Sequence, residues 1–263
     1  MIPLRDNIPT SRPPVVTYAI IAANVLVYFL WQRGGLTLGD PSSPHYLHQL
    51  VDWGAIPYEL THPGDHCELV NSVGQLACEG QRGVTGTAGP QPPTYLTPFT
   101  AMFMHGGLLH LGGNMLFLWI FGNNVEDSMG PVKFIVFYLL GGLAAVALQV
   151  VTGPNSAVPT LGASGAIAAV LGGYILLFPR ARVVTVVFII FFFTIIELPA
   201  LIVLGIWFIE QAVMGYYDLA QPGQGGGGGV AYFAHVGGFV FGLLAIRVFA
   251  TRKRVDRQRY VRR

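Results

Sequence analysis

Long runs of uncharged apolar residues dominate this sequence and restrict the folds that it can adopt. A helix needs about 20 such residues to cross the hydrocarbon core of a bilayer, and six runs approach that length. They cover residues 15–31, 100–121, 133–151, 163–178, 198–216 and 230–249. Only 11% of all residues are charged, whereas soluble domains average about 25%. The sequence therefore predicts an all-α membrane protein, a bundle of six transmembrane helices.

The basic residues predict how these helices are oriented. Six spans place both termini on one side of the membrane, and Lys and Arg concentrate in cytoplasmic segments. That side would hold Arg5, Arg12, Lys133, Arg180, Arg182, Arg247 and the basic tail. Only Arg33 and Arg82 would remain outside. We therefore expect a multi-pass protein of the cell membrane, with both termini in the cytoplasm.

This topology divides the chain into a cytoplasmic N-terminus at 1–14, a membrane domain at 15–250 and a basic cytoplasmic tail at 251–263. We interpret the charge of the tail as a topology anchor rather than a nucleic-acid-binding patch. Residues 183–196 form one more apolar stretch, but fourteen residues are short for a span. We expect an interfacial or re-entrant segment there, because a seventh helix would put the basic tail outside. The glycine run at 225–229 is expected to be a flexible hinge before the last helix.

A long external loop at 32–99 separates the first two spans and contains most of the acidic residues. It also contains both cysteines, Cys67 and Cys78. On the oxidising side of the membrane these two can form a disulfide. A metal or redox pair is disfavoured, because the spacing is not C-x-x-C. The loop is interpreted as too short and irregular to be an enzyme domain of its own.

Several polar side chains lie within the predicted spans, where they are costly and therefore candidates for function. The second span carries His105, His110 and Asn114, the fourth carries Ser164, and the sixth carries His235. Ser164, His235, His110 and Asn114 each fall in the first half of a span that runs from outside to inside. They can therefore meet in one layer below the outer surface. Ladders of small residues would let the fourth and sixth helices approach closely.

Three other interpretations of these residues are open. Each histidine could simply satisfy a hydrogen bond between helices. The three imidazoles could hold a metal, although the five-residue spacing puts His105 and His110 on different faces of a helix, so no metal is predicted. The protein could also be a transporter that uses Glu197 and Glu210 as coupling groups.

Three motifs together resemble the rhomboid family of intramembrane serine proteases over about residues 97–250. They are His105-x4-His110-x3-Asn114, Gly162-Ala163-Ser164-Gly165 and Ala234-His235-x-Gly237-Gly238-x3-Gly242. The resemblance implies a six-helix rhomboid-like bundle with a Ser–His dyad and no cofactor. Its substrates would be the transmembrane or juxtamembrane segments of other membrane proteins. A transporter or an inactive rhomboid-like binding protein remains the alternative.

The resemblance also implies a role for each matching residue. Ser164 would be the nucleophile and His235 the general base, while His110, Asn114 and the Ser164 backbone N–H would form the oxyanion hole. Glu126, in Gly122-x3-Glu126-x3-Gly130, would hold the cytoplasmic turn. Gly162, Gly238 and Gly242 would be structural. The fifth helix and the loop before the sixth would form the substrate gate.

Two departures from the family pattern change these expectations. Many members carry Trp-Arg before the second helix, where this chain has Tyr95-Leu96-Thr97-Pro98-Phe99-Thr100. Some members stack a tyrosine four residues after the serine on the catalytic histidine, and here that residue is Ala168. No acidic third member is predicted, because Glu210 and Asp218 are the only carboxylates near the outer half of the last two spans. The sequence does not identify what supports the His235 ring.

Overall fold

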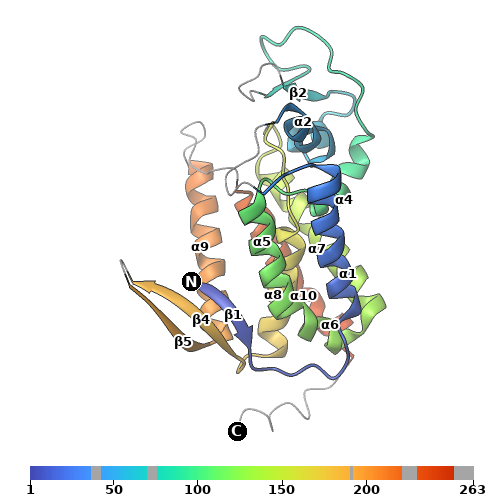
Figure 1. Ribbon diagram of the computed structural model, residues 1–263. Coiled ribbons are helices and arrows are strands. Elements are labelled where there is room, and N and C mark those ends of the chain that lie inside the picture. The colour runs from blue at the N-terminus through green and yellow to red at the C-terminus, as the bar shows by residue number, and fades with distance from the viewer. Residues whose placement is uncertain (37–42, 70–75, 190–191, 221–229, 252–263) are drawn as a thin grey trace.

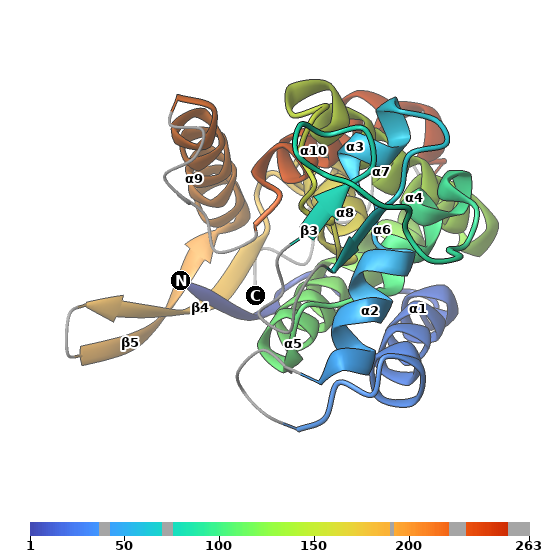
Figure 2. The same ribbon diagram turned by 90° about the horizontal axis from the view of Figure 1, so that it is seen from above.

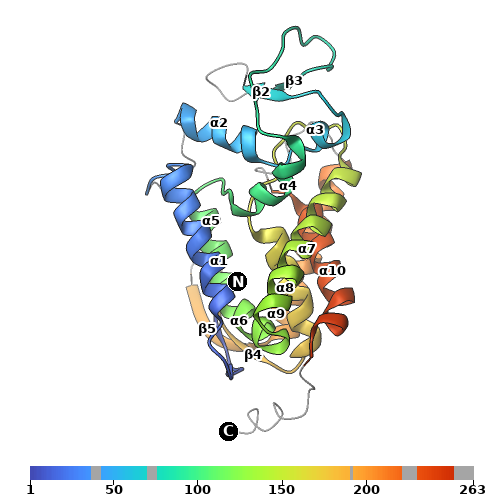
Figure 3. The same cartoon turned by 90° about the vertical axis from the view of Figure 1, so that its right-hand side faces the viewer.

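The computed structural model describes residues 1–36, 43–69, 76–189, 192–220 and 230–251, and Figure 1 shows their arrangement. The glycine run at 225–229 and nearly all of the tail at 251–263 lie outside the described residues. A bundle of apolar helices forms the body of the molecule (Figures 1 and 3). Its members are α1 (Val15–Leu26) with its π-helical end η1 (Val27–Trp31), α5 (Leu108–Phe117), the π-helical η4 (Leu118–Gly122), α6 (Asn123–Met129), α7 (Pro131–Thr152), α8 (Ser164–Leu177), α9 (Ala200–Ala220) and α10 (Tyr232–Phe249).

Helix α8 is the centre of this bundle. Every residue from 165 to 175 is buried, and α7 and α10 are its main neighbours. In the described part of the chain, α7, α9 and α10 are long and apolar enough to cross a membrane. The segment Val15–Trp31 and α8 are shorter apolar helices. The six-span topology itself remains a prediction, although five of the six apolar runs coincide closely with a bundle helix.

The second apolar run does not coincide with one helix, so the expected boundaries 100–121 were wrong. Residues before Leu108 form short turns instead: η2 (Thr94–Leu96), α4 (Thr97–Thr100) and η3 (Ala101–Phe103). The backbone is extended at Met104, with ψ 143°, and again at Gly107. Glycines at 106 and 107 disfavour continuation of a helix. The helical segment therefore starts later and continues through η4 and α6 to Met129.

A β-sheet corrects the all-α expectation. Strands β4 (Arg182–Ile189) and β5 (Phe192–Pro199) form an antiparallel hairpin where an interfacial or re-entrant segment was expected, and β1 (Ile2–Asp6) pairs with β4. The strand order is β1-β4-β5. Valine, isoleucine, threonine and phenylalanine make up most of the hairpin, and these residues favour strands. Figures 1 and 3 show the sheet at the α6 end of the bundle.

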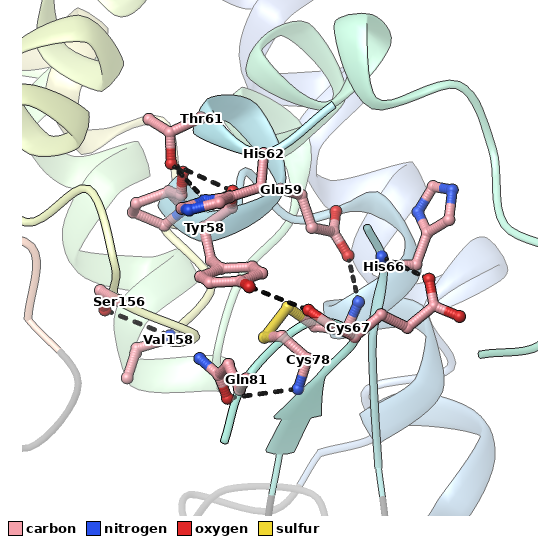
Figure 4. The surroundings of a disulfide bond; sticks show 12 residues. Tyr58, Glu59, Thr61, His62, His66, Cys67, Cys78, Gln81, Ser156 and Val158 are labelled. Atoms are coloured by element: carbon pink, nitrogen blue, oxygen red, sulfur yellow. Dashed lines mark hydrogen bonds between the residues drawn. A yellow bond between two sulfur atoms is a disulfide. The ribbon is translucent and has the colours of Figure 1, made fainter. Parts of the chain in front are cut away.

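The external loop at 32–99 is more ordered than expected and covers the opposite end of the bundle (Figures 1 and 3). It contains α2 (Pro44–Trp53), α3 (Pro57–Thr61) and a hairpin of β2 (Cys67–Leu69) and β3 (Leu76–Cys78). A disulfide joins Cys67 to Cys78. Both cysteines are buried in a small apolar cluster with Val51, Ile56 and Tyr58. Figure 4 shows Tyr58 beside the disulfide, and its hydroxyl donates to the Glu79 carbonyl over 2.9 Å. We call the described residues of the loop at 32–99 the outer layer.

Candidate active site

Ser164 is the first residue of α8 and follows a turn that other elements hold in place. The Gly162 N–H donates to the Ala101 carbonyl over 2.9 Å, and Thr160 pairs with Ala55 of the outer layer through two backbone hydrogen bonds. Gly162 has φ +108°, a conformation that costs little only for glycine. The turn places Ser164 at the start of a helix, where backbone N–H groups have no intrahelical partner.

His235 lies in the first turn of α10, opposite Ser164. Its Nε2 is 2.8 Å from Ser164 Oγ. The two helices carry these residues close together because they pack on glycine. A Cβ added at Gly238 would lie 2.0 Å from the Gly165 carbonyl oxygen, and one at Gly242 would lie 2.0 Å from that of Ala169. The small-residue ladders expected from the sequence therefore bring the serine and the histidine together.

The other ring nitrogen of His235 contacts α9. Nδ1 is 2.7 Å from Gln211 Oε1, and the Trp207 ring lies 5.6 Å from the imidazole between centroids. Sequence reasoning missed Gln211, because it considered only carboxylates as partners for this histidine. A signal was present: Gln211 is an amide inside an apolar run, and it follows Trp207 by four residues, so both lie on one face of a helix.

His110 and Asn114 of α5 lie on the other side of the Gly162 turn. A Cβ added at Gly162 would be 2.8 Å from His110 Nε2 and 3.3 Å from Asn114 Nδ2. His110 Nδ1 accepts from the Gly106 N–H over 3.3 Å, so the ring proton is on Nε2. Asn114 is 8% exposed, and among the described residues its Nδ2 has no hydrogen-bond partner. Two side-chain donors thus converge on Gly162, two residues before Ser164.

His105 does not lie where helical spacing put it. The five-residue spacing predicted that His105 and His110 lie on different faces of one helix, but their rings make an edge contact with centroids 5.2 Å apart. The reason is that His105 precedes the start of α5, so helical periodicity does not apply to the pair. Gln32 holds the His105 backbone through two hydrogen bonds of 3.0 Å. His105 is fully buried, and its ring packs against the His110 ring.

A small cavity of about 20 Å³ adjoins Ser164. That volume is close to the space of one water molecule. Its walls are mainly alanine and glycine, including Ala101, Gly142, Ala145, Gly165 and Ala234. Ser164 therefore lines a space of about the size of one water molecule.

Glu126 lies far from this site along the bundle. Its carboxylate accepts from the backbone N–H groups of Val16 and Thr17 and from the Thr17 hydroxyl, over 2.7–3.0 Å. Glu126 thus caps the N-terminus of α1 from α6. The two carboxylates considered for transport, Glu197 on β5 and Glu210 on α9, are both exposed, so neither lies inside the bundle.

Comparison with known proteins gives a family match. A model of the Rhomboid domain matches residues 92–252, more than half of the chain. The chain is 30% identical to "Rhomboid protein 1, mitochondrial" of Saccharomyces cerevisiae over 151 residues, which cover 54% of this chain and 38% of that protein. It is 29% identical to "Rhomboid protease GluP" of Bacillus subtilis over 159 residues, which cover 60% of this chain and 24% of that protein. It is 31% identical to the mouse "Presenilin-associated rhomboid-like protein, mitochondrial" over 113 residues, which cover 41% of this chain and 29% of that protein. The matches therefore span well under half of each relative.

Proposed function

The chain belongs to the rhomboid family, and on this premise we propose that it is an intramembrane serine endopeptidase. Its substrates are membrane proteins, which it cleaves within or beside a transmembrane segment. The observation that carries the proposal is the 2.8 Å contact between Ser164 Oγ and His235 Nε2. This is the hydrogen bond that an activated nucleophile makes with its base.

The dyad performs hydrolysis in two stages. Ser164 Oγ attacks the scissile carbonyl carbon while its proton passes to His235 Nε2. The imidazolium then gives that proton to the leaving amine as the C–N bond breaks, which leaves an acyl ester on Ser164. A water molecule then loses a proton to Nε2 and attacks the ester, and the imidazolium returns that proton to Ser164 Oγ as the ester bond breaks and the carboxylic acid product leaves. The cavity beside Ser164 offers a place for this water.

Charge on the substrate oxygen is stabilised by donors that are already in position. His110 Nε2–H and Asn114 Nδ2–H face the Gly162 turn, and the backbone N–H of Ser164 lies at the start of α8. A buried donor that has no partner within the described part of the chain, such as Asn114 Nδ2, loses no hydrogen bond of that part when an oxyanion forms. Preorganised donors of this kind are usually the largest single contribution to acyl transfer.

Helix α9 is the element that admits the substrate. Figures 1 and 2 both show α9 at the edge of the bundle, and α10 is its main helical neighbour. Its outward side chains are large, apolar and about half exposed, among them Leu201, Ile206, Ile209 and Val213. A substrate helix that packs against this surface reaches Ser164 when α9 moves aside.

Membership of the rhomboid family also supports a proposed location and topology for the protein. We propose that the protein lies in the cell membrane as a six-span bundle over 15–250, with cytoplasmic termini and the basic tail as anchor. The complete dyad with its donors favours an enzyme over an inactive rhomboid-like binding protein. The exposure of Glu197 and Glu210 disfavours a transporter.

The test is a cleavage assay with the purified full chain in detergent micelles and a single-span membrane protein as substrate. Wild-type protein is expected to give two fragments whose masses sum to the substrate plus one water, whereas Ser164→Ala gives none. Equal cleavage by Ser164→Ala would overturn the serine mechanism. Stable binding of a panel of single-span proteins without any fragment from the wild type would instead indicate an inactive binding protein.

A further inference from the structure

We propose that Gln211 is a positioning residue of the dyad: its side-chain oxygen fixes the tautomer and the orientation of the His235 ring. This inference rests on the proposed function, because it concerns how the same dyad is held ready. It also ties the dyad to α9, the helix assigned above to substrate entry.

The geometry defines which nitrogen carries the proton. An amide oxygen only accepts hydrogen bonds, so the 2.7 Å contact with Gln211 Oε1 requires a proton on His235 Nδ1. In a neutral imidazole the other nitrogen then has a free lone pair. That nitrogen, Nε2, is the one 2.8 Å from Ser164 Oγ. Gln211 thus selects the only neutral tautomer that can accept the serine proton.

Trp207 completes the support from one turn earlier on α9. Its ring lies 5.6 Å from the imidazole and 6.3 Å from the Phe239 ring, between centroids. The residue on α8 that some family members use for this purpose is Ala168 here, and its small side chain is fully buried. The aromatic support of the His235 ring therefore comes from α9, while α8 contacts it through Ser164.

An amide suits this position better than a carboxylate would. Gln211 is 7% exposed and lies in an apolar helix, where an unpaired charge is expensive to bury. A glutamine gives a directional acceptor without that cost. The hydrogen bond from Nδ1 also strengthens when His235 becomes an imidazolium, because its donor is then charged.

Support from α9 makes the dyad sensitive to the position of that helix. Gln211 and Trp207 both reach His235 from α9, while Ser164 and His235 belong to α8 and α10, which pack closely on each other. A displacement of α9 leaves the serine and histidine adjacent but removes the Nδ1 acceptor. The dyad is consequently complete only while α9 rests on α10.

The experiment compares Gln211→Met with a matched control in the full chain. Methionine has a similar length and volume but only a weak acceptor sulfur. The control is Gln149→Met, because Gln149 is also a glutamine that bonds α10, through the Ala234 N–H at 3.1 Å, without touching the imidazole. Two properties are measured: kcat and KM for a single-span substrate, and the His235 tautomer by ¹⁵N NMR of histidine-labelled protein, assigned with a His235→Asn variant.

Gln211→Met is expected to lower kcat by about 10- to 100-fold, which corresponds to about 1.4–2.7 kcal/mol at about 1.4 kcal/mol for each tenfold change, with little change in KM. Its His235 signal is expected to show a mixture of tautomers, while wild type and Gln149→Met show Nδ1–H alone. An unchanged tautomer or an unchanged kcat in Gln211→Met would overturn the proposal. If Gln211→Met does not fold, Gln211→Asn, whose shorter side chain retracts the acceptor, takes its place with the same expected results.

The two readouts also separate this inference from the proposed function. A wild-type protein that cleaves nothing refutes the proteolytic function, yet its NMR spectrum still reports whether Gln211 fixes the ring. A wild-type protein that cleaves while Gln211→Met cleaves equally well refutes this inference alone.

Discussion

Gly238 of α10 lies against the backbone carbonyl of Gly165 on α8, so closely that an added Cβ would be 2.0 Å from that oxygen. The contact is one residue after Ser164 and three after His235. It therefore lets α8 and α10 approach closely beside Ser164 and His235.

Gly238→Ala is accordingly expected to separate α8 from α10 and to lower both stability and cleavage. Overpacking of a close contact costs about 1–3 kcal/mol, and a shift of the helices lengthens the Ser164–His235 hydrogen bond. Gly205→Ala on α9 is the control, since a Cβ there meets nothing within 4 Å, and alanine favours a helix. Thermal unfolding and cleavage rates in one detergent measure both effects. Wild-type values for Gly238→Ala would contradict the proposed close packing.

Removal of either oxyanion donor is expected to slow cleavage without abolishing it. His110→Ala and Asn114→Ala each lose one side-chain donor, while the Ser164 backbone N–H remains. The expected loss is about 10²- to 10³-fold in kcat. His105→Ala is expected to cost less, because the His105 ring packs against the His110 ring and is not one of the proposed oxyanion donors. Rates for folded variants, checked by thermal unfolding, test this order. A dead His105→Ala beside fully active His110→Ala and Asn114→Ala would show that the wrong residues were assigned.

A pH effect on stability is expected from the N-terminal strand. Asp6 accepts hydrogen bonds from the Tyr174 hydroxyl over 2.6 Å and from Asn124 over 2.7 Å, and burial raises its pKa from 3.8 to about 6. The folded protein therefore holds a proton on Asp6 that the unfolded chain releases. Stability from this group is full below pH 4 and is lost as the pH rises through 6. Asp6→Asn should remove this loss, and melting temperatures from pH 4 to 7.5 compare the two chains. If the melting temperatures of the wild type and Asp6→Asn change in the same way with pH, Asp6 does not cause the loss of stability.

The disulfide is expected to stabilise the outer layer without contributing to chemistry. Cys67 and Cys78 close a short loop, with a sequence separation of 11, for which chain entropy gives about 2–3 kcal/mol. A Cys67→Ala, Cys78→Ala double variant should therefore exchange its outer-layer amide hydrogens faster while kcat stays within about twofold of wild type. A large fall in kcat with unchanged hydrogen exchange would give the cysteines a role at the active site.

Much of the bundle could be predicted from the sequence, because its apolar runs are long and few polar residues interrupt them. Five of six runs match helices because a stretch that is long, apolar and free of charge can be satisfied in lipid only as a helix. Ser164 and His235 could be paired because glycines follow each of them on the facing helices. The start of the second run was misjudged, since Gly106 and Gly107 carry more weight than hydropathy.

The features that could not be predicted from the sequence depend on tertiary contacts or on the types of residue within an apolar run. The β4–β5 hairpin has the hydropathy of a membrane segment, and only its β-branched and aromatic content distinguishes it from a helix. The contact between Gln32 and His105 joins residues 73 positions apart, and no local pattern encodes it. Gln211 was overlooked because a neutral amide does not stand out as a catalytic partner, although its spacing from Trp207 was visible.

The most direct test of the account is covalent labelling of the purified full chain with a fluorophosphonate, which reacts with serines that a neighbouring base activates. Peptide mass spectrometry should find the adduct on Ser164 of the wild-type protein. The same peptide should remain unlabelled in His235→Ala, whereas Gly205→Ala should label like the wild type. Labelling of Ser164 at an undiminished rate in His235→Ala, or an adduct on a different residue, would contradict the Ser164–His235 dyad.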